Sequence, residues 1–214
     1  ILYANGSYIG GIAGDLTAAS VKNSFSYYLD EDGNAPFGVL GTGSNGNAVS
    51  SFYLSDKPVS GFKGIAKGTD GFMCGEVLYF INGASEHGTV WKQGAQYPLI
   101  AGEGELVNPV YQVVIAPLMA GYKDVKVNFS DEINDKAVVD NSIGTRSVYV
   151  TSGTAIEFTI AHDTENISVD ITGVKPIPTI EPSKTINGTV TVSGSDIRIL
   201  YTLGTLDPNG ADIS

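Results

Sequence analysis

The sequence has one cysteine and two histidines among 214 residues, and this scarcity limits its chemistry. A single cysteine, Cys74, forms no internal disulfide. His87 and His162 offer little for metal binding or acid–base catalysis, and no His-Glu-x-x-His motif of metalloproteases is present. Serine and aspartate occur throughout, so spacing selects no Ser-His-Asp triad around either histidine. We therefore predict no catalytic residues, no metal and no cofactor: the chain is not expected to be an enzyme.

Basic residues are also scarce, with 12 Lys and Arg against 23 Asp and Glu and a formal net charge of −11. An acidic chain repels phosphate backbones, which argues against a nucleic-acid partner. No apolar run reaches the roughly 18 residues that a membrane-spanning helix needs, so no membrane insertion is expected. Because the sequence starts at Ile1 and shows no signal peptide, we expect a fragment of a longer exported precursor.

Glycine, by contrast, is abundant, at 27 residues, and hydrophobic residues make up 42% of the chain. This composition is typical of a globular protein with many tight turns. Many turns imply many short elements, which favours strands over helices. The sequence therefore predicts an all-β protein.

A repeat with an offset of 27 residues occurs near the N-terminus. The matching pairs are Gly11 and Gly38, Gly14 and Gly41, Ser24 and Ser51, and Phe25 and Phe52. Each unit has a short apolar strand between glycines, then a polar turn and a second strand, near 20–29 and 47–54. Such units bury their apolar faces by stacking, so the pattern predicts β-solenoid coils. A β-meander with accidental similarity is the alternative.

These residues resemble the GLUG repeat of bacterial surface proteins and of some immunoglobulin-A-cleaving proteases. The resemblance covers residues 9–14 and 19–26, and more loosely 38–53, where Ser50 replaces the expected asparagine. It implies β-helical coils in an adhesin-like protein. In the proteases the repeat is an accessory region and carries no catalytic residue.

A helix is predicted over residues 70–82, with an N-cap region at Thr69-Asp70 and a stop at Asn82-Gly83. Together with 90–93 and 97–100, this segment resembles one that often follows GLUG coils, where a helix and a short hairpin close the stack. Covering an open solenoid end hides both apolar surface and strand edges. We expect a first domain over 1–110.

Alternation of apolar and polar residues dominates the remainder of the chain and predicts strands with one buried face. One such strand contains Ile156, Phe158 and Ile160, with Glu157 and Thr159 on its outer face. We predict a small antiparallel β-sandwich or β-grasp-like module over 111–206, then a polar tail over 207–214. Residues 148–201 resemble internalin B-repeats, but the usual glycine–tyrosine is absent, which leaves an immunoglobulin-like sandwich as an alternative.

Four aromatic residues are the candidate ligand-binding residues: Tyr27, Tyr28, Tyr53 and Trp91. Packing under the cap is the competing interpretation for Trp91. The acidic segment Asp30–Asp32 resembles part of a calcium loop, but Gly41 stands where the bidentate glutamate is needed, and a turn explains it as well. Four triplets, 5–7, 128–130, 166–168 and 187–189, fit the Asn-x-Ser/Thr pattern and are interpreted as turn or strand residues.

These observations favour a non-enzymatic adhesion or scaffold segment of a larger secreted bacterial protein. The alternatives are an accessory carbohydrate-binding region and a non-catalytic part of a surface protease or glycoside hydrolase. We expect an extracellular or cell-surface location, a monomer, and a host or matrix protein or a glycan as partner.

Overall fold

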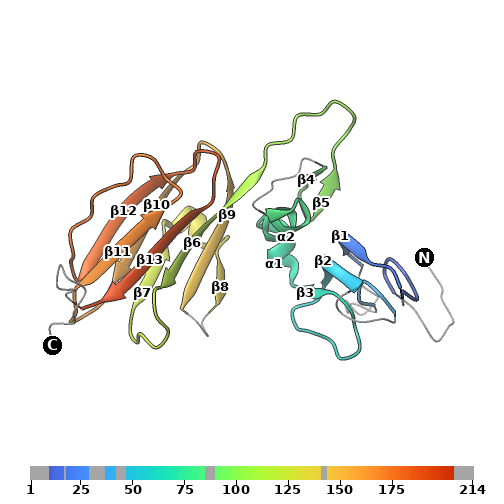
Figure 1. Ribbon diagram of the computed structural model, residues 1–214, viewed down its shortest axis with the longest axis horizontal. Helices are drawn as coiled ribbons and strands as arrows, with labels where there is room; N and C mark the ends of the chain where they lie inside the picture. Colours follow the sequence, from blue (N-terminus) through green and yellow to red (C-terminus); the bar gives the residue numbers. More distant parts are fainter. Residues whose placement is uncertain are drawn as a thin grey trace. The chain divides into compact units, whose positions relative to one another are not determined.

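A computed structural model of the chain describes residues 10–16, 18–28, 37–41, 47–84, 90–140 and 144–204. Two compact units divide the chain, residues 1–109 and 110–214 (Figure 1). The described residues form thirteen strands and three helices of four to six residues. Strands predominate, which confirms the all-β class. The acidic segment Asp30–Asp32 and the tail 207–214 lie outside the described residues.

The first unit contains five short strands and two helices. Its elements are β1 (Val21–Ser26), β2 (Ala48–Leu54), β3 (Ile65–Lys67), α1 (Thr69–Met73), α2 (Glu76–Ile81), β4 (Trp91–Gln93) and β5 (Pro98–Ile100). Strands β1, β2 and β3 form one parallel sheet in that order, and β4 and β5 form an antiparallel hairpin.

The two sequence repeats pair side by side at their 27-residue offset. Strands β1 and β2 are parallel, with Ser24 opposite Ser51 and Phe25 opposite Phe52. An isolated parallel bridge between Ala13 and Leu40 has the same offset. A meander would make successive strands antiparallel, so the meander alternative is wrong for this pair.

The predicted solenoid does not continue among the described residues, which instead form separate small sheets. A third coil would put residue 79 beside Phe52, but Phe52 lies opposite Ile65 of β3. Tyr79 belongs to α2. The prediction of a coil stack is therefore corrected to one three-stranded parallel sheet followed by helices, because the sequence after β2 loses the glycine-framed period and gains helix-compatible apolar residues.

The single helix predicted over 70–82 is in fact two helices, α1 and α2, separated at Cys74 and Gly75. Gly75 has φ +93°, a left-handed conformation that glycine adopts readily and that ends a right-handed helix. The first helix begins after Gly68, with no side-chain cap, so the predicted Thr69-Asp70 cap is wrong.

An aromatic cluster joins the repeats to the helices and the hairpin. Its buried members are Phe52, Leu54, Phe72, Val77 and Ile81, with Phe25, Tyr27, Phe80, Trp91 and Tyr97 packed against them. Asn82 ties α2 to β4: its Nδ2 donates to the Trp91 carbonyl (2.8 Å) and its Oδ1 accepts from the Trp91 N–H (3.1 Å). The two phenylalanines of the repeat thus share one apolar environment.

The second unit consists of two sheets. Its elements are β6 (Val110–Pro117), β7 (Lys126–Phe129), α3 (Asp131–Asn134), β8 (Val138–Asp140), β9 (Thr145–Thr151), β10 (Ala155–Ala161), β11 (Ile167–Thr172), β12 (Thr185–Thr191) and β13 (Ile197–Leu203). One sheet has the order β12-β10-β7 and the other has the order β11-β13-β6-β9-β8 (Figure 1).

The core of the second unit lies between these two sheets. Side chains from both contribute to one hydrophobic cluster, including Ile156 and Ile160 of β10, Val113 of β6 and Ile199 of β13, all 0% exposed. The prediction of a purely antiparallel module is wrong at one pair of strands, because β6 and β13 are parallel. The first and last strands of the unit, β6 and β13, lie side by side in the larger sheet. The sequence did not predict their parallel pairing, because alternation of apolar and polar residues is the same for either strand direction.

Candidate functional site

The four aromatic candidates lie in the first unit but do not form one exposed row. Tyr53 is 2% exposed, and its hydroxyl accepts a hydrogen bond from the Val59 N–H (3.0 Å). Tyr27 and Trp91 are half-buried in the aromatic cluster, with ring centroids 4.7 Å from Tyr97 and 5.4 Å from Phe25, respectively. Tyr28 is 47% exposed. Three of the four rings make packing contacts inside the first unit, and Tyr28 is the exposed one.

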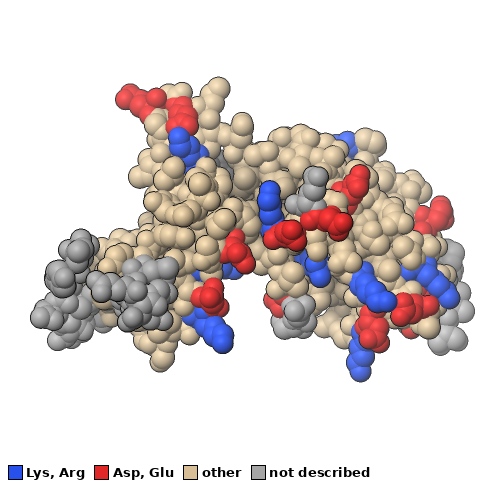
Figure 2. All heavy atoms as spheres, turned by 180° about the vertical axis from the view of Figure 1, so that it is seen from behind, with Lys and Arg blue, Asp and Glu red and all other residues tan. Residues whose placement is uncertain are grey.

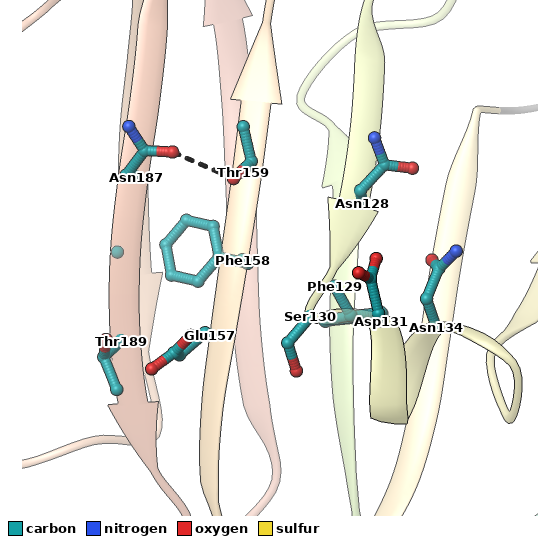
Figure 3. Close-up of a pocket in the computed structure, with 11 residues that line it drawn as sticks. Asn128, Phe129, Ser130, Asp131, Asn134, Glu157, Phe158, Thr159, Asn187 and Thr189 are labelled. Carbon is teal, nitrogen blue, oxygen red and sulfur yellow. Dashed lines mark hydrogen bonds between the residues drawn. The ribbon is translucent and has the colours of Figure 1, made fainter.

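A polar hollow of about 800 Å³ lies on the outer face of the three-stranded sheet in the second unit. Figure 3 shows β10 along its middle, β12 on one side, and β7 with α3 on the other. The hollow is an open groove rather than an enclosed cavity. We call it the β7–β10–β12 groove; its polar lining residues are Asn128, Ser130, Asp131, Asn134, Glu157, Thr159, Asn187 and Thr189.

Strand register explains why these polar side chains gather. Thr159 of β10 lies opposite both Asn187 of β12 and Asn128 of β7, which makes one polar row across the sheet. Glu157 lies opposite Thr189, and the Glu157 carbonyl accepts a hydrogen bond from the Ser130 N–H (3.0 Å). Thr189, Glu157 and Ser130 therefore make a second polar row. Because side chains alternate between the two faces, both rows point to the same side.

An apolar row lies between the two polar rows and faces the core. Phe158 is 2% exposed and pairs with Gly188 of β12 and Phe129 of β7. A Cβ at Gly188 would lie 2.5 Å from Cζ of Phe158, so only glycine leaves room for this ring. The packed phenylalanines give the groove a rigid floor.

Two interactions orient the amides that line the groove. The Thr159 hydroxyl donates to Oδ1 of Asn187 (2.9 Å), and Nη1 of Arg146 donates to Oδ1 of Asn134 (2.8 Å). Both bonds use the amide oxygen, which leaves the Nδ2 hydrogens of Asn134 and Asn187 as donors. The groove therefore has oriented donors on both sides.

The groove is also acidic, because it contains the carboxylates of Glu157 and Asp131. Among the described residues, neither carboxylate has a hydrogen-bond or ion-pair partner. Both residues are exposed. Over the face drawn in Figure 2, acidic and basic side chains are interspersed. The carboxylates in the groove are thus acceptors that no ion pair neutralises, although the Arg146 guanidinium reaches the lining at Asn134.

Other reactive groups contribute little to a site. Within the part of the chain that the structure describes, no group of three or more His, Cys, Asp or Glu residues could hold a metal ion. Burial raises the pKa of the Cys74 thiol. Nδ1 of His162 accepts a hydrogen bond from the backbone N–H of Glu165 (2.9 Å), which stabilises a turn.

No helix within the described ranges is long and apolar enough to cross a membrane.

Sequence reasoning identified only part of the β7–β10–β12 groove. Alternation correctly placed Glu157 and Thr159 on the outer face of their strand. Asn128 and Asn187 were noted only as Asn-x-Ser/Thr residues, interpreted as turn or strand residues; both lie in strands. The missing information was the register that sets them beside Thr159. The pattern itself does not select these two triplets, since 166–168 also fits it and does not line the groove.

Comparison with protein families, with curated proteins and with solved structures found no match to this chain.

Proposed function

We propose that this chain is a non-enzymatic adhesion or scaffold segment of a larger secreted bacterial protein, acting outside the cell or at its surface. The observation that carries this proposal is the parallel pairing of β1 and β2, which sets Phe25 opposite Phe52. With β3 beside them, the two repeats form one small parallel sheet, and Phe25 and Phe52 pack with the helices and the hairpin in one aromatic cluster. A compact non-catalytic module of this kind suits a segment that holds or presents other parts of a surface protein.

The division into two units supports the same role. The first unit supplies the paired repeats, and the second supplies a rigid two-sheet module with an outer groove. The partner is a host or matrix protein or a glycan, and the chain acts as a monomer. Its net charge of −11 favours solubility outside the cell.

The role can be tested by displaying the chain on a non-adherent bacterium and measuring retention on cultured host cells and on matrix-coated surfaces. We expect several-fold more retention than with an unrelated β-domain of equal length displayed in the same way. Equal retention would contradict adhesion. Cleavage of protein or polysaccharide substrates by the purified chain would contradict the non-enzymatic assignment.

An accessory carbohydrate-binding role is the second candidate. The observation that favours it is the β7–β10–β12 groove, where amides, hydroxyls and carboxylates lie side by side over a rigid floor. Sugars are recognised by such convergent polar groups in preformed hollows. The four aromatic candidates, Tyr27, Tyr28, Tyr53 and Trp91, lie in the other unit.

A further inference from the structure

We propose that the β7–β10–β12 groove binds a neutral oligosaccharide through the two polar rows that cross the three-stranded sheet. This inference rests on the proposed binding role of the chain and assigns that role to a site. The rows are Asn187, Thr159 and Asn128, and Thr189, Glu157 and Ser130.

The spacing of the two rows suits a chain of sugar rings. Neighbouring strands lie about 4.8 Å apart, and residues two positions apart along a strand lie about 7 Å apart. Six polar side chains therefore form a regular grid of three columns and two rows. A volume of about 800 Å³ is large enough for a short oligosaccharide, and ligand sites usually measure roughly 300–1,000 Å³.

The chemistry of the grid suits hydroxyl groups, which both donate and accept. The Nδ2 groups of Asn134 and Asn187 are donors, because their amide oxygens already accept from Arg146 and Thr159. The carboxylates of Glu157 and Asp131 are acceptors. Hydrogen bonds to a carboxylate are shorter and stronger than those between neutral groups. A sugar ring with several hydroxyls can satisfy both kinds of partner at once.

Charge selects against acidic sugars. Glu157 and Asp131 lie in the groove without an ion-pair partner among the described residues, and Arg146, which is bonded to Asn134 of the lining, sets one positive charge against these two. A uronate or sialate carboxylate would therefore meet a net negative lining. A neutral sugar needs no counter-charge. The groove lies on the face of the sheet over β10, whose backbone is paired on both sides, so an extended peptide in the groove cannot add there as a further strand.

The test is an NMR titration of the full isotope-labelled chain, with mannan, xylan, β-glucan, galactan and chitin oligosaccharides as neutral probes and sialyl-lactose and polygalacturonate oligosaccharides as acidic ones. Without an exposed aromatic ring in the groove, affinity rests on hydrogen bonds, so we expect a Kd on the order of 1 mM. Amide signals of Asn128, Thr159 and Asn187 should shift with at least one neutral probe and with neither acidic one.

Two matched variants assign the binding to the groove. Glu157→Gln keeps the size of the side chain but removes its charge, and should weaken binding roughly tenfold. Asp170→Asn neutralises an exposed carboxylate on β11, in the other sheet, and should leave binding unchanged. The unperturbed amide spectrum of each variant verifies its fold.

Four results would each overturn the sugar site. They are amide shifts confined to the first unit, equal loss of affinity in both variants, binding that a chelator abolishes, and no amide shift with any neutral probe. If displayed chains adhere while no neutral probe binds, only this assignment fails and the adhesion role stands. If neutral probes bind but displayed chains do not adhere, the adhesion role fails and the sugar site stands.

Discussion

Among the described residues of the first unit, Glu76 is the one buried acidic side chain. It is 5% exposed and forms a short ion pair with Lys67, which is itself partly exposed. A carboxylate in this position needs its partner, because an unpaired buried charge is costly. The pair joins β3 to α2 and fixes the entry of the second helix.

Removing Lys67 should therefore destabilise the first unit. We expect Lys67→Met to lower the free energy of unfolding by about 2 kcal/mol, since Glu76 is left buried without a cation. Urea unfolding followed by the fluorescence of Trp91 measures this change locally. Adding Glu76→Gln to Lys67→Met should recover part of the loss. Lys92→Met, which breaks the exposed pair with Glu105, is the matched control and should have a much smaller effect.

Gly188 is a second residue on which local packing depends. A methyl group there would meet the buried ring of Phe158 at 2.5 Å. We expect Gly188→Ala to lower stability by about 2 kcal/mol through overpacking, as measured by the denaturant midpoint of circular dichroism. Combining it with Phe158→Leu, which shortens the side chain, should cost less than the sum of the two single changes. Strict additivity would show that the glycine and the ring do not interact.

At the level of residues, the sequence predicts which side chains face outward but not which ones meet. Glu157 and Thr159 were placed correctly because period-2 alternation is a local property. The neighbours of Thr159 come from β7 and β12, which lie on either side of β10 in the chain, and register between distant strands has no local signal. The groove was missed for this reason.

At the level of elements, the paired repeats determine how the first unit folds. Phe52 is 2% exposed in the aromatic cluster, while Phe25 is only half-buried beside Trp91. Phe52→Ala should cost about 4 kcal/mol and Phe25→Ala roughly half of that, because a partly solvated site loses less contact. Urea titration gives both values.

The same pair of variants has a spectroscopic readout. Phe25→Ala opens the side of Trp91 to water and should shift its emission to longer wavelength even in the folded state. An equal cost at the two positions, or unchanged emission with Phe25→Ala, would contradict the shared cluster.

Repetition made the β1–β2 pairing predictable, since equivalent positions in stacked repeats become neighbours. The sequence predicts where the helical segment begins and ends, but not the break at Cys74 and Gly75 that divides it into α1 and α2. Gly75 inside an otherwise helical pattern is compatible with either a continuous or a broken helix. In the structure its φ is left-handed, and Phe72 before it and Val77 after it are both buried in the aromatic cluster. Parallel pairing of β6 with β13 was missed because strand direction has no signature in alternation.

For the whole molecule, each unit has its own core. Every member of the large cluster between the two sheets comes from the second unit, and the aromatic cluster comes from the first. We expect residues 110–204 alone to unfold cooperatively, with a far-ultraviolet spectrum typical of strands. A fragment from residue 118 onward lacks β6, which pairs with both β9 and β13, and should not fold. An unfolded 110–204 fragment would contradict independent cores.

Asn82 has a consequence for how the protein ages. It precedes Gly83, and an asparagine before glycine readily cyclises to a succinimide when the glycine nitrogen attacks the side-chain carbon. In the native chain that nitrogen donates to the Phe80 carbonyl (3.1 Å), and the amide is bonded to both backbone groups of Trp91. Deamidation there requires the helix end and the hairpin to separate first. The cyclisation expels ammonia, and water then opens the succinimide to aspartate or isoaspartate, so isoaspartate at position 82 in a stored sample would record past openings of the first unit.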